Sequence, residues 1–149
     1  MNNNYRARTD YIVIHSTKTK SSENLSAKDI TLKHRKEGFF HNAFHFIIKR
    51  DGTVEDGRDI EMSGAILPIN QPLITNQNSI AIALVGGLSQ DGVNLDTNFT
   101  YEQYASLREL VKRLKKKYNV EVVGCRNAIN SKSCMSFDVQ AIVDWDASS

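Results

Sequence analysis

Three side chains, one near the start of the sequence and two near its end, are of types that together could hold a metal ion. They are His15, which ends the apolar run Tyr11-Ile12-Val13-Ile14, and the two cysteines, Cys125 and Cys134. One imidazole and two thiolates can build a Zn²⁺ site with three protein ligands and an open fourth position, the arrangement of catalytic zinc. The sequence therefore predicts a zinc site at His15, Cys125 and Cys134. For Cys125 a buried thiol, or a bond to Cys134 if both are oxidised, stays open as an alternative.

The composition is that of one globular domain. The chain has 149 residues, of which 40% are hydrophobic and 24% charged. A net charge of +2 is too small to predict a nucleic-acid polymer as partner. No segment approaches the roughly 20 apolar residues of a membrane span, and residues 1–8 lack the apolar core of a secretory signal. We expect one domain over 1–149, with 1–9 as a flexible N-terminus, no membrane partner, and a cytoplasmic location that favours reduced or metal-bound cysteines.

The spacing of apolar residues predicts strands mixed with helices. Ser26 with Asp29 caps a helix that runs to about Glu37, and Thr100 with Gln103 caps a longer helix over about 101–118. Further elements are strands over 11–16, 43–50, 53–55, 79–85 and 120–123, and a closing helix over 138–145. The stretch 62–78 has no clear periodicity and is predicted to be a surface loop. This order predicts the α/β class, with a central mixed β-sheet flanked by helices.

Several motifs resemble one known family in the order of that family. They are Ile14-His15-Ser16, the segment from His45 to Glu55, Asn78-Ser79-Ile80, Leu84-Val85-Gly86-Gly87, Lys132-Ser133-Cys134 and Ser136-Phe137-Asp138. Together they resemble the zinc-dependent N-acetylmuramoyl-L-alanine amidases of small phage lysozymes, which share a fold with peptidoglycan-recognition proteins. The resemblance spans Ile12 to Trp145. It implies an amidase-like domain in the cytoplasm of a bacterial host, with His15 and Cys134 as zinc ligands and Lys132 assisting the chemistry.

Other positions depart from that family's pattern. In Gly124-Cys125-Arg126 a cysteine stands where the resemblance implies the second histidine ligand. Phe44 stands at the position of a tyrosine, and Ile66 at that of a further histidine. Losing one donor to the oxyanion typically lowers turnover by on the order of 10²–10³. Two thiolates would also largely cancel the charge of Zn²⁺ and weaken its pull on a carbonyl.

These changes lead to three hypotheses of function. The sequence favours a degenerate amidase-fold protein whose cleft, with Phe44, Ile66 and Asn78, binds a cell-wall fragment or another small polar ligand without cutting it. The first alternative is an active zinc amidase of the endolysin type that uses Cys125 as a ligand. The second is an inhibitor that binds a protein partner through the apolar loop 62–77. His34 and His41 are predicted to be solvent-facing or structural, and His45 to pack beneath the site.

Overall fold

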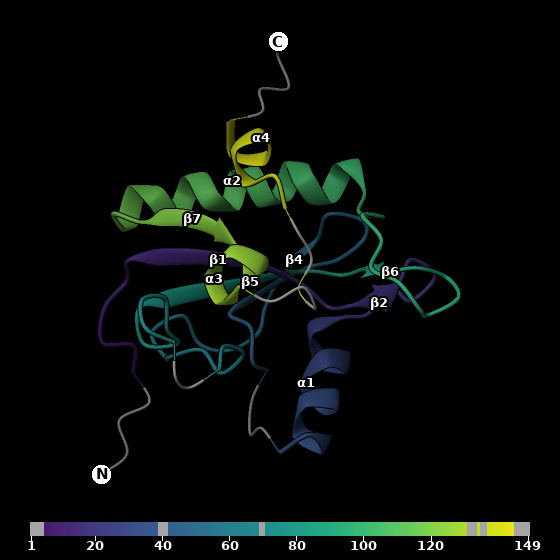
Figure 1. Cartoon of the computed structure of the whole chain (residues 1–149), viewed down its shortest axis with the longest axis horizontal. Coiled ribbons are helices and arrows are strands. Elements are labelled where there is room, and N and C mark those ends of the chain that lie inside the picture. Colours follow the sequence, from purple (N-terminus) through teal and green to yellow (C-terminus); the bar gives the residue numbers. More distant parts are fainter. Residues whose placement is uncertain (1–4, 39–41, 69–70, 131–133, 135–136, 145–149) are drawn as a thin grey trace.

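A five-stranded sheet forms the centre of the fold (Figure 1). The computed structural model describes residues 5–38, 42–68, 71–130, 134 and 137–144. The sheet has the order β4-β3-β5-β1-β7, in which β4 alone is antiparallel to its neighbour. The strand bounds are Tyr11–Ser16 for β1, Phe46–Ile48 for β3, Val54–Asp56 for β4, Ser79–Leu84 for β5 and Glu121–Gly124 for β7.

The two central strands are buried on both faces. Every residue of β5 is buried, as are all of β1 except Tyr11, and the register pairs His15 with Ala83. Continuous apolar runs of this kind are typical of parallel strands covered on both sides, and the sequence predicted both of them. Successive side chains of a strand point to opposite faces, so Ile12 and Ile14 share one face while Val13 and His15 share the other.

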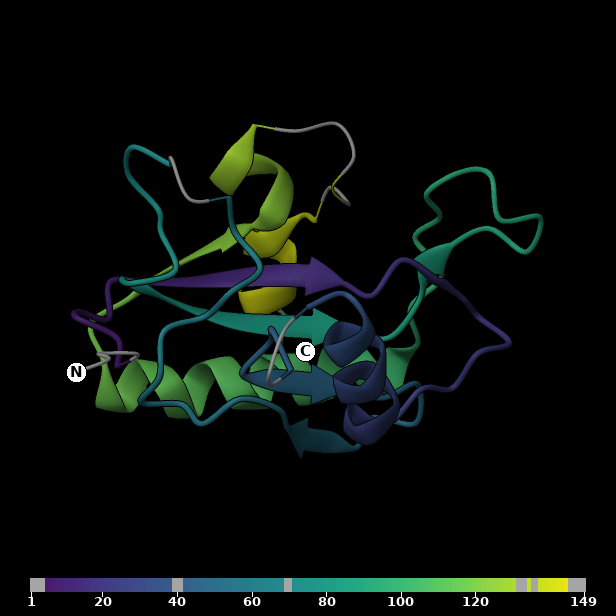
Figure 2. The ribbon, with the colours of Figure 1, turned by 90° about the horizontal axis from the view of Figure 1, so that it is seen from below.

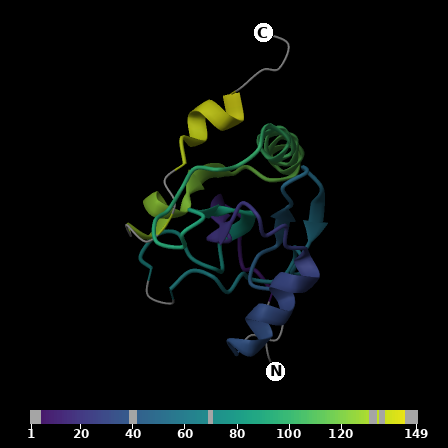
Figure 3. The same cartoon turned by 90° about the vertical axis from the view of Figure 1, so that its right-hand side faces the viewer.

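Helices cover the sheet from both sides (Figure 3). On one side lie α2 (Tyr101–Lys117) and α4 (Val139–Asp144), and on the other lies α1 (Ala27–Lys36). The α2 side holds the largest apolar cluster, which includes Ile12, Ile14, Ile80, Ile82, Leu107, Leu110, Val111 and Leu114. The α1 side holds a smaller cluster of Ala27, Ile30, Phe44, Ile47, Ala81, Ala83 and Val85. The predicted α/β fold with a mixed sheet between helices is confirmed.

Local sequence signals predicted where the two longest helices begin but missed the shortest elements. The capping boxes at Ser26 and Thr100 are both present. Three short elements were not predicted: β2 (Thr19–Lys20), β6 (Gly87–Leu88) and α3 (Cys125–Ile129). The parallel pair β2 and β6 lies beyond the ends of β1 and β5 (Figure 2).

The predicted strand 43–50 is shorter in the structure, where it spans Phe46–Ile48. Its late start has a physical reason. The backbone N–H of Ala43 donates to Nδ1 of His34, and that of Phe44 donates to the side chain of Asn42. Because side chains take these two donors, the ladder with β5 begins only after them.

Residues 5–8 are attached to the domain, in contrast to the flexible N-terminus predicted for 1–9. The backbone N–H of Arg6 donates to the carbonyl of Glu61, and that of Arg8 donates to the carbonyl of Gln77. These bonds tie the segment to the two ends of the 62–78 loop. Among the described residues, no helix combines the length and the apolar character that crossing a membrane requires.

Candidate functional site

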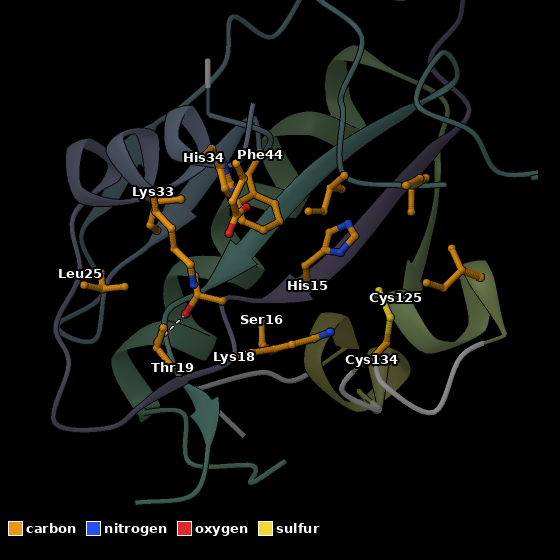
Figure 4. Close-up of a pocket in the computed structure, with 16 residues that line it drawn as sticks. His15, Ser16, Lys18, Thr19, Leu25, Lys33, His34, Phe44, Cys125 and Cys134 are labelled. Atoms are coloured by element: carbon orange, nitrogen blue, oxygen red, sulfur yellow. Dashed lines mark hydrogen bonds between the residues drawn. A yellow bond between two sulfur atoms is a disulfide. The ribbon is translucent and has the colours of Figure 1, made fainter. Parts of the chain in front are cut away.

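A cavity of about 350 Å³ opens at the carboxyl end of β1, between α1 and α3 (Figure 4). The carboxyl ends of parallel strands are where ligands bind in open α/β sheets. His15 from β1, Phe44 from the segment before β3, and Cys125 from the start of α3 all line this cavity. The cavity thus brings together five of the residues that the sequence singled out: His15, Phe44, Ile66, Cys125 and Cys134.

His15 brings a buried and neutral imidazole to the cavity. The residue is only 4% exposed, and within the described part of the chain its Nε2 has no hydrogen-bond partner. Burial lowers the pKa of His15 to about 3, and the positive charge of Lys18 adds to this effect. A buried polar atom without a partner is destabilising, so such an atom in a native fold needs an explanation. A metal ion bound through the lone pair of this nitrogen would explain it.

Cys125 and Cys134 are joined by a disulfide in this structure. This is the alternative that the sequence left open for Cys125. As the side chains are placed in the described ranges, no group of three or more His, Cys, Asp or Glu could hold a metal ion. Thiolates are the form of cysteine that binds metals, so the predicted zinc set needs the reduced pair.

In the reduced state the three side chains fit zinc by their chemistry. The donors would be the unpartnered Nε2 of His15 and the two sulfurs, whose Cα atoms lie 5.8 Å apart. An imidazole with two thiolates is a known donor set of catalytic zinc sites. The metal role of His15, Cys125 and Cys134 accordingly stays a prediction.

The walls of the cavity are apolar where the resemblance implies polar groups. The Phe44 ring lies between His15 and His34, with 5.5 Å between the ring centroids on each side. Ile66 lines the cavity next to Leu67, and Leu67 packs with Val13 and the two cysteines. The predicted loop 62–78 therefore contributes a wall of the cavity as well as an outer surface.

Two other predicted site residues lie elsewhere. Asn78 precedes β5, at the opposite end of the parallel strands from His15. Its side chain donates to the carbonyl of Leu73 and accepts from the N–H of Thr75, so it shapes the loop rather than the cavity. The predicted binding role of Asn78 finds no support in this arrangement. Lys132 lies outside the described residues, as does His41.

Lys18 lines the cavity and was not singled out from the sequence. Its backbone has φ of 57°, the left-handed region that non-glycine residues rarely adopt. In Figure 4 the side chain runs below His15 toward the cysteine pair. The pKa of His15 is lowered partly by this ammonium group, in agreement with that placement. Left-handed backbone at non-glycine residues clusters at functional sites, but nothing in the sequence around Lys18 signals it.

The other two described histidines hold backbone groups in place, and His34 also lines the cavity. His45 is buried and bridges two backbone groups: Nδ1 accepts from the N–H of Ala81, and Nε2 lies 2.7 Å from the carbonyl of Met62. This pattern assigns the hydrogen to Nε2. His34 is also buried, so the structural alternative holds for it and the solvent-facing one is wrong.

His45 should make the free energy of unfolding depend on pH. Burial lowers its folded-state pKa to about 4, whereas an unfolded chain has the ordinary value near 6.5. The unfolded state therefore binds more protons in this window, so stability falls as the pH decreases from 6.5 toward 4. From pH 8 to pH 5 the loss due to His45 should be about 2 kcal/mol.

Urea denaturation of the wild type and of His45→Gln at both pH values isolates this contribution. The difference in free energy of unfolding between the two proteins should shrink at the lower pH. An equal pH dependence in both would contradict the assignment.

Comparison with known proteins gives consistent matches over most of the chain. The sequence profile of the family described as N-acetylmuramoyl-L-alanine amidase matches residues 5–136. The protein named endolysin of Escherichia phage T7 is 40% identical over 135 residues, which cover 91% of this chain and 85% of that protein. The endolysin of Klebsiella phage KP32 is 35% identical over the same coverage.

Solved structures agree on the fold. The amidase LysCS of Clostridium intestinale URNW superposes with a TM-score of 0.75 at 23% identity, covering 95% of this chain and 86% of that one. The peptidoglycan-recognition protein PGRP-SA of bumblebee gives a TM-score of 0.72 at 20% identity, covering 97% and 86%. At these identities the similarity concerns the fold alone.

Proposed function

The chain belongs to the N-acetylmuramoyl-L-alanine amidase family, and from this we propose that it is an active phage endolysin. It would hydrolyse the amide bond between N-acetylmuramic acid and L-alanine in peptidoglycan. The observation that carries the proposal is the buried, unpartnered Nε2 of His15 in a cavity that also contains both cysteines. The relatives named endolysin support this alternative over the degenerate protein that the sequence favoured.

The reduced chain would hold zinc through Nε2 of His15 and the thiolates of Cys125 and Cys134. When bound, Zn²⁺ supplies a Lewis acid and lowers the pKa of water. The burial that lowers the pKa of His15 keeps its imidazole unprotonated, and therefore able to ligate, at any neutral or mildly acidic pH. We infer synthesis in the reducing cytoplasm of a bacterial host, where both thiols would persist.

Lys18 would supply the positive charge that this ligand set lacks. Two thiolates cancel the charge of Zn²⁺, whereas the ammonium group of Lys18 adds a full charge beside the same cavity. We propose that it donates a hydrogen bond to the substrate carbonyl oxygen as negative charge develops there. Such a donor replaces the tyrosine hydroxyl that Phe44 lacks. The apolar rings and chains of Phe44, Ile66 and Leu67 limit water around that bond and strengthen it.

Ligand binding without cleavage is the second candidate. Its support is the apolar wall of the cavity of about 350 Å³, where Phe44 and Ile66 stand in place of a tyrosine and a histidine and neither side chain can transfer a proton. A protein partner at the 62–77 loop gains less support, because Leu67 and Ile74 are buried against Val13. Among the described residues of that loop, Leu73 is the one large exposed apolar side chain, and a single one is ordinary for a surface.

Hydrolysis of a defined muropeptide tests the proposal. Reduced protein with equimolar zinc should release the stem peptide, identified by mass spectrometry. His15→Ala should lower that rate by at least about 10³-fold, since a metal contributes several kcal/mol to the transition state. His45→Gln, which changes a histidine outside the cavity, is the matched control and should retain most of the activity.

Calorimetry with the same muropeptide separates the two candidates. Binding without release of peptide by zinc-loaded protein would contradict the amidase and support the binding protein. Neither binding nor cleavage would contradict both.

A further inference from the structure

We propose that Cys125 and Cys134 are a redox-sensitive pair, in which a bound zinc ion and a disulfide exclude each other. The inference rests on the zinc site of the proposed function. It adds that this chain loses its metal when the pair is oxidised and regains it on reduction. The cysteine at position 125 makes this possible, since a histidine there could not form a disulfide.

The local fold brings the two sulfurs together. Cys125 begins α3 directly after β7, and the helix ends at Ile129, followed by Asn130 with a left-handed backbone (φ 51°, ψ 47°). Cys134 follows four residues later, with its Cα 5.8 Å from that of Cys125. This separation lies in the range that a disulfide requires.

Both sulfurs also belong to the cavity that contains His15. Cys134 is 3% exposed and Cys125 is 7% exposed, and each lines the cavity wall. The apolar neighbours Val13, Leu67 and Ile74 pack around the pair. Two thiolates in such surroundings are costly without a cation, because burial disfavours the charged form. A metal ion or a disulfide each removes that cost, by neutralising the charges or by eliminating them.

The two states cannot coexist. Sulfurs that share a tetrahedral zinc ion at about 2.3 Å each lie about 3.8 Å apart. In a disulfide they lie about 2.05 Å apart and no longer carry the negative charge that ligates. His15 would then be the only predicted ligand left, and one imidazole does not retain zinc. The unpartnered Nε2 of His15 in the disulfide form is the expected consequence.

A small disulfide such as oxidised glutathione is a sufficient oxidant. One cysteine thiolate attacks a sulfur of glutathione disulfide and forms a mixed disulfide, while one glutathione thiolate leaves. The second cysteine thiolate attacks the cysteine sulfur of that bond, and the second glutathione thiolate leaves. In total the protein pair loses two electrons, glutathione disulfide gains them, and the zinc ion is released with its charge unchanged.

Titration of zinc-loaded protein with oxidised glutathione tests the inference. Released zinc is measured with a chromogenic chelator, and free thiols by alkylation under denaturing conditions followed by mass spectrometry. Loss of two thiols should accompany release of one zinc per chain, with a mass decrease of about 2 Da. Metal-free protein should oxidise at least about tenfold faster, because bound zinc depletes the reactive form by mass action.

Cys125→His is the matched control, because it keeps a possible ligand and removes the disulfide. It should retain zinc at oxidant concentrations that empty the wild type. A wild-type chain that keeps zinc while its thiols disappear, or keeps both thiols at every concentration, would overturn the inference. If both thiols persist, hydrolysis by zinc-loaded protein would still support the proposed function. A chain that switches as described but cleaves nothing would contradict the proposed function alone, and one that binds no zinc when reduced would contradict both.

Discussion

Phe44→Tyr is expected to raise kcat for muropeptide hydrolysis by about 10²-fold or more, the typical contribution of one oxyanion donor. The Phe44 ring lies against His15, 5.5 Å between centroids, so a hydroxyl added to it would enter the cavity beside the predicted zinc ligand. That hydroxyl would act on charge that develops only in the transition state. KM and zinc content should therefore change little.

Phe46→Tyr is the matched control for this substitution. Phe46 begins β3 two residues later, and it packs against the cluster on the α2 side of the sheet. A hydroxyl there cannot reach the cavity, so kcat should stay at the wild-type value. Steady-state kinetics with zinc-saturated proteins makes the comparison. An unchanged kcat in Phe44→Tyr would contradict the expectation that a hydroxyl at position 44 reaches the developing charge.

Lys18→Met is expected to lower kcat by on the order of 10²–10³, again with KM and zinc content nearly unchanged. The substitution removes the ammonium group and keeps a side chain of similar length. Lys18→Gly should lower kcat equally, but with the free energy of unfolding unchanged or higher by up to about 1 kcal/mol. The reason is that glycine adopts the left-handed backbone of this residue without the strain of a side chain.

Lys20→Met controls for the loss of a positive charge nearby. Lys20 lies in β2, two residues along the chain, and does not line the cavity. It should leave kcat unchanged. The opposite effects of Lys18→Gly on stability and on turnover are the specific signature of a side chain kept for function. A Lys18→Met enzyme with wild-type kcat would contradict the proposed donor.

Much of the fold could be predicted because its signals are local. Ser26 and Thr100 are capping residues whose partners lie three positions on, and both boxes form as predicted. The buried strand from Ser79 was also evident from its apolar run. The start of β3 could not be predicted, because side chains of His34 and Asn42 compete there for the backbone donors.

The site could be predicted only in part. His15 and the two cysteines were recognisable by residue type, and the structure brings them to one cavity. No pattern in the sequence specifies that the two sulfurs meet, as they do in the structure. Lys18 was missed for a similar reason, since its direction follows from backbone dihedrals. Asn78 was assigned to the site by its motif alone, whereas its position at the far end of β5 depends on strand direction.

The metal content of reduced protein tests the central claim most directly. Wild-type chain and His15→Ala are purified with a thiol reductant, dialysed against equimolar zinc and then against buffer, and analysed by atomic emission. We expect about one zinc per wild-type chain, from the three ligands of a catalytic site, and clearly less in His15→Ala. Equal zinc in the two proteins, or none in the reduced wild type, would contradict the claim that His15, Cys125 and Cys134 form the zinc site.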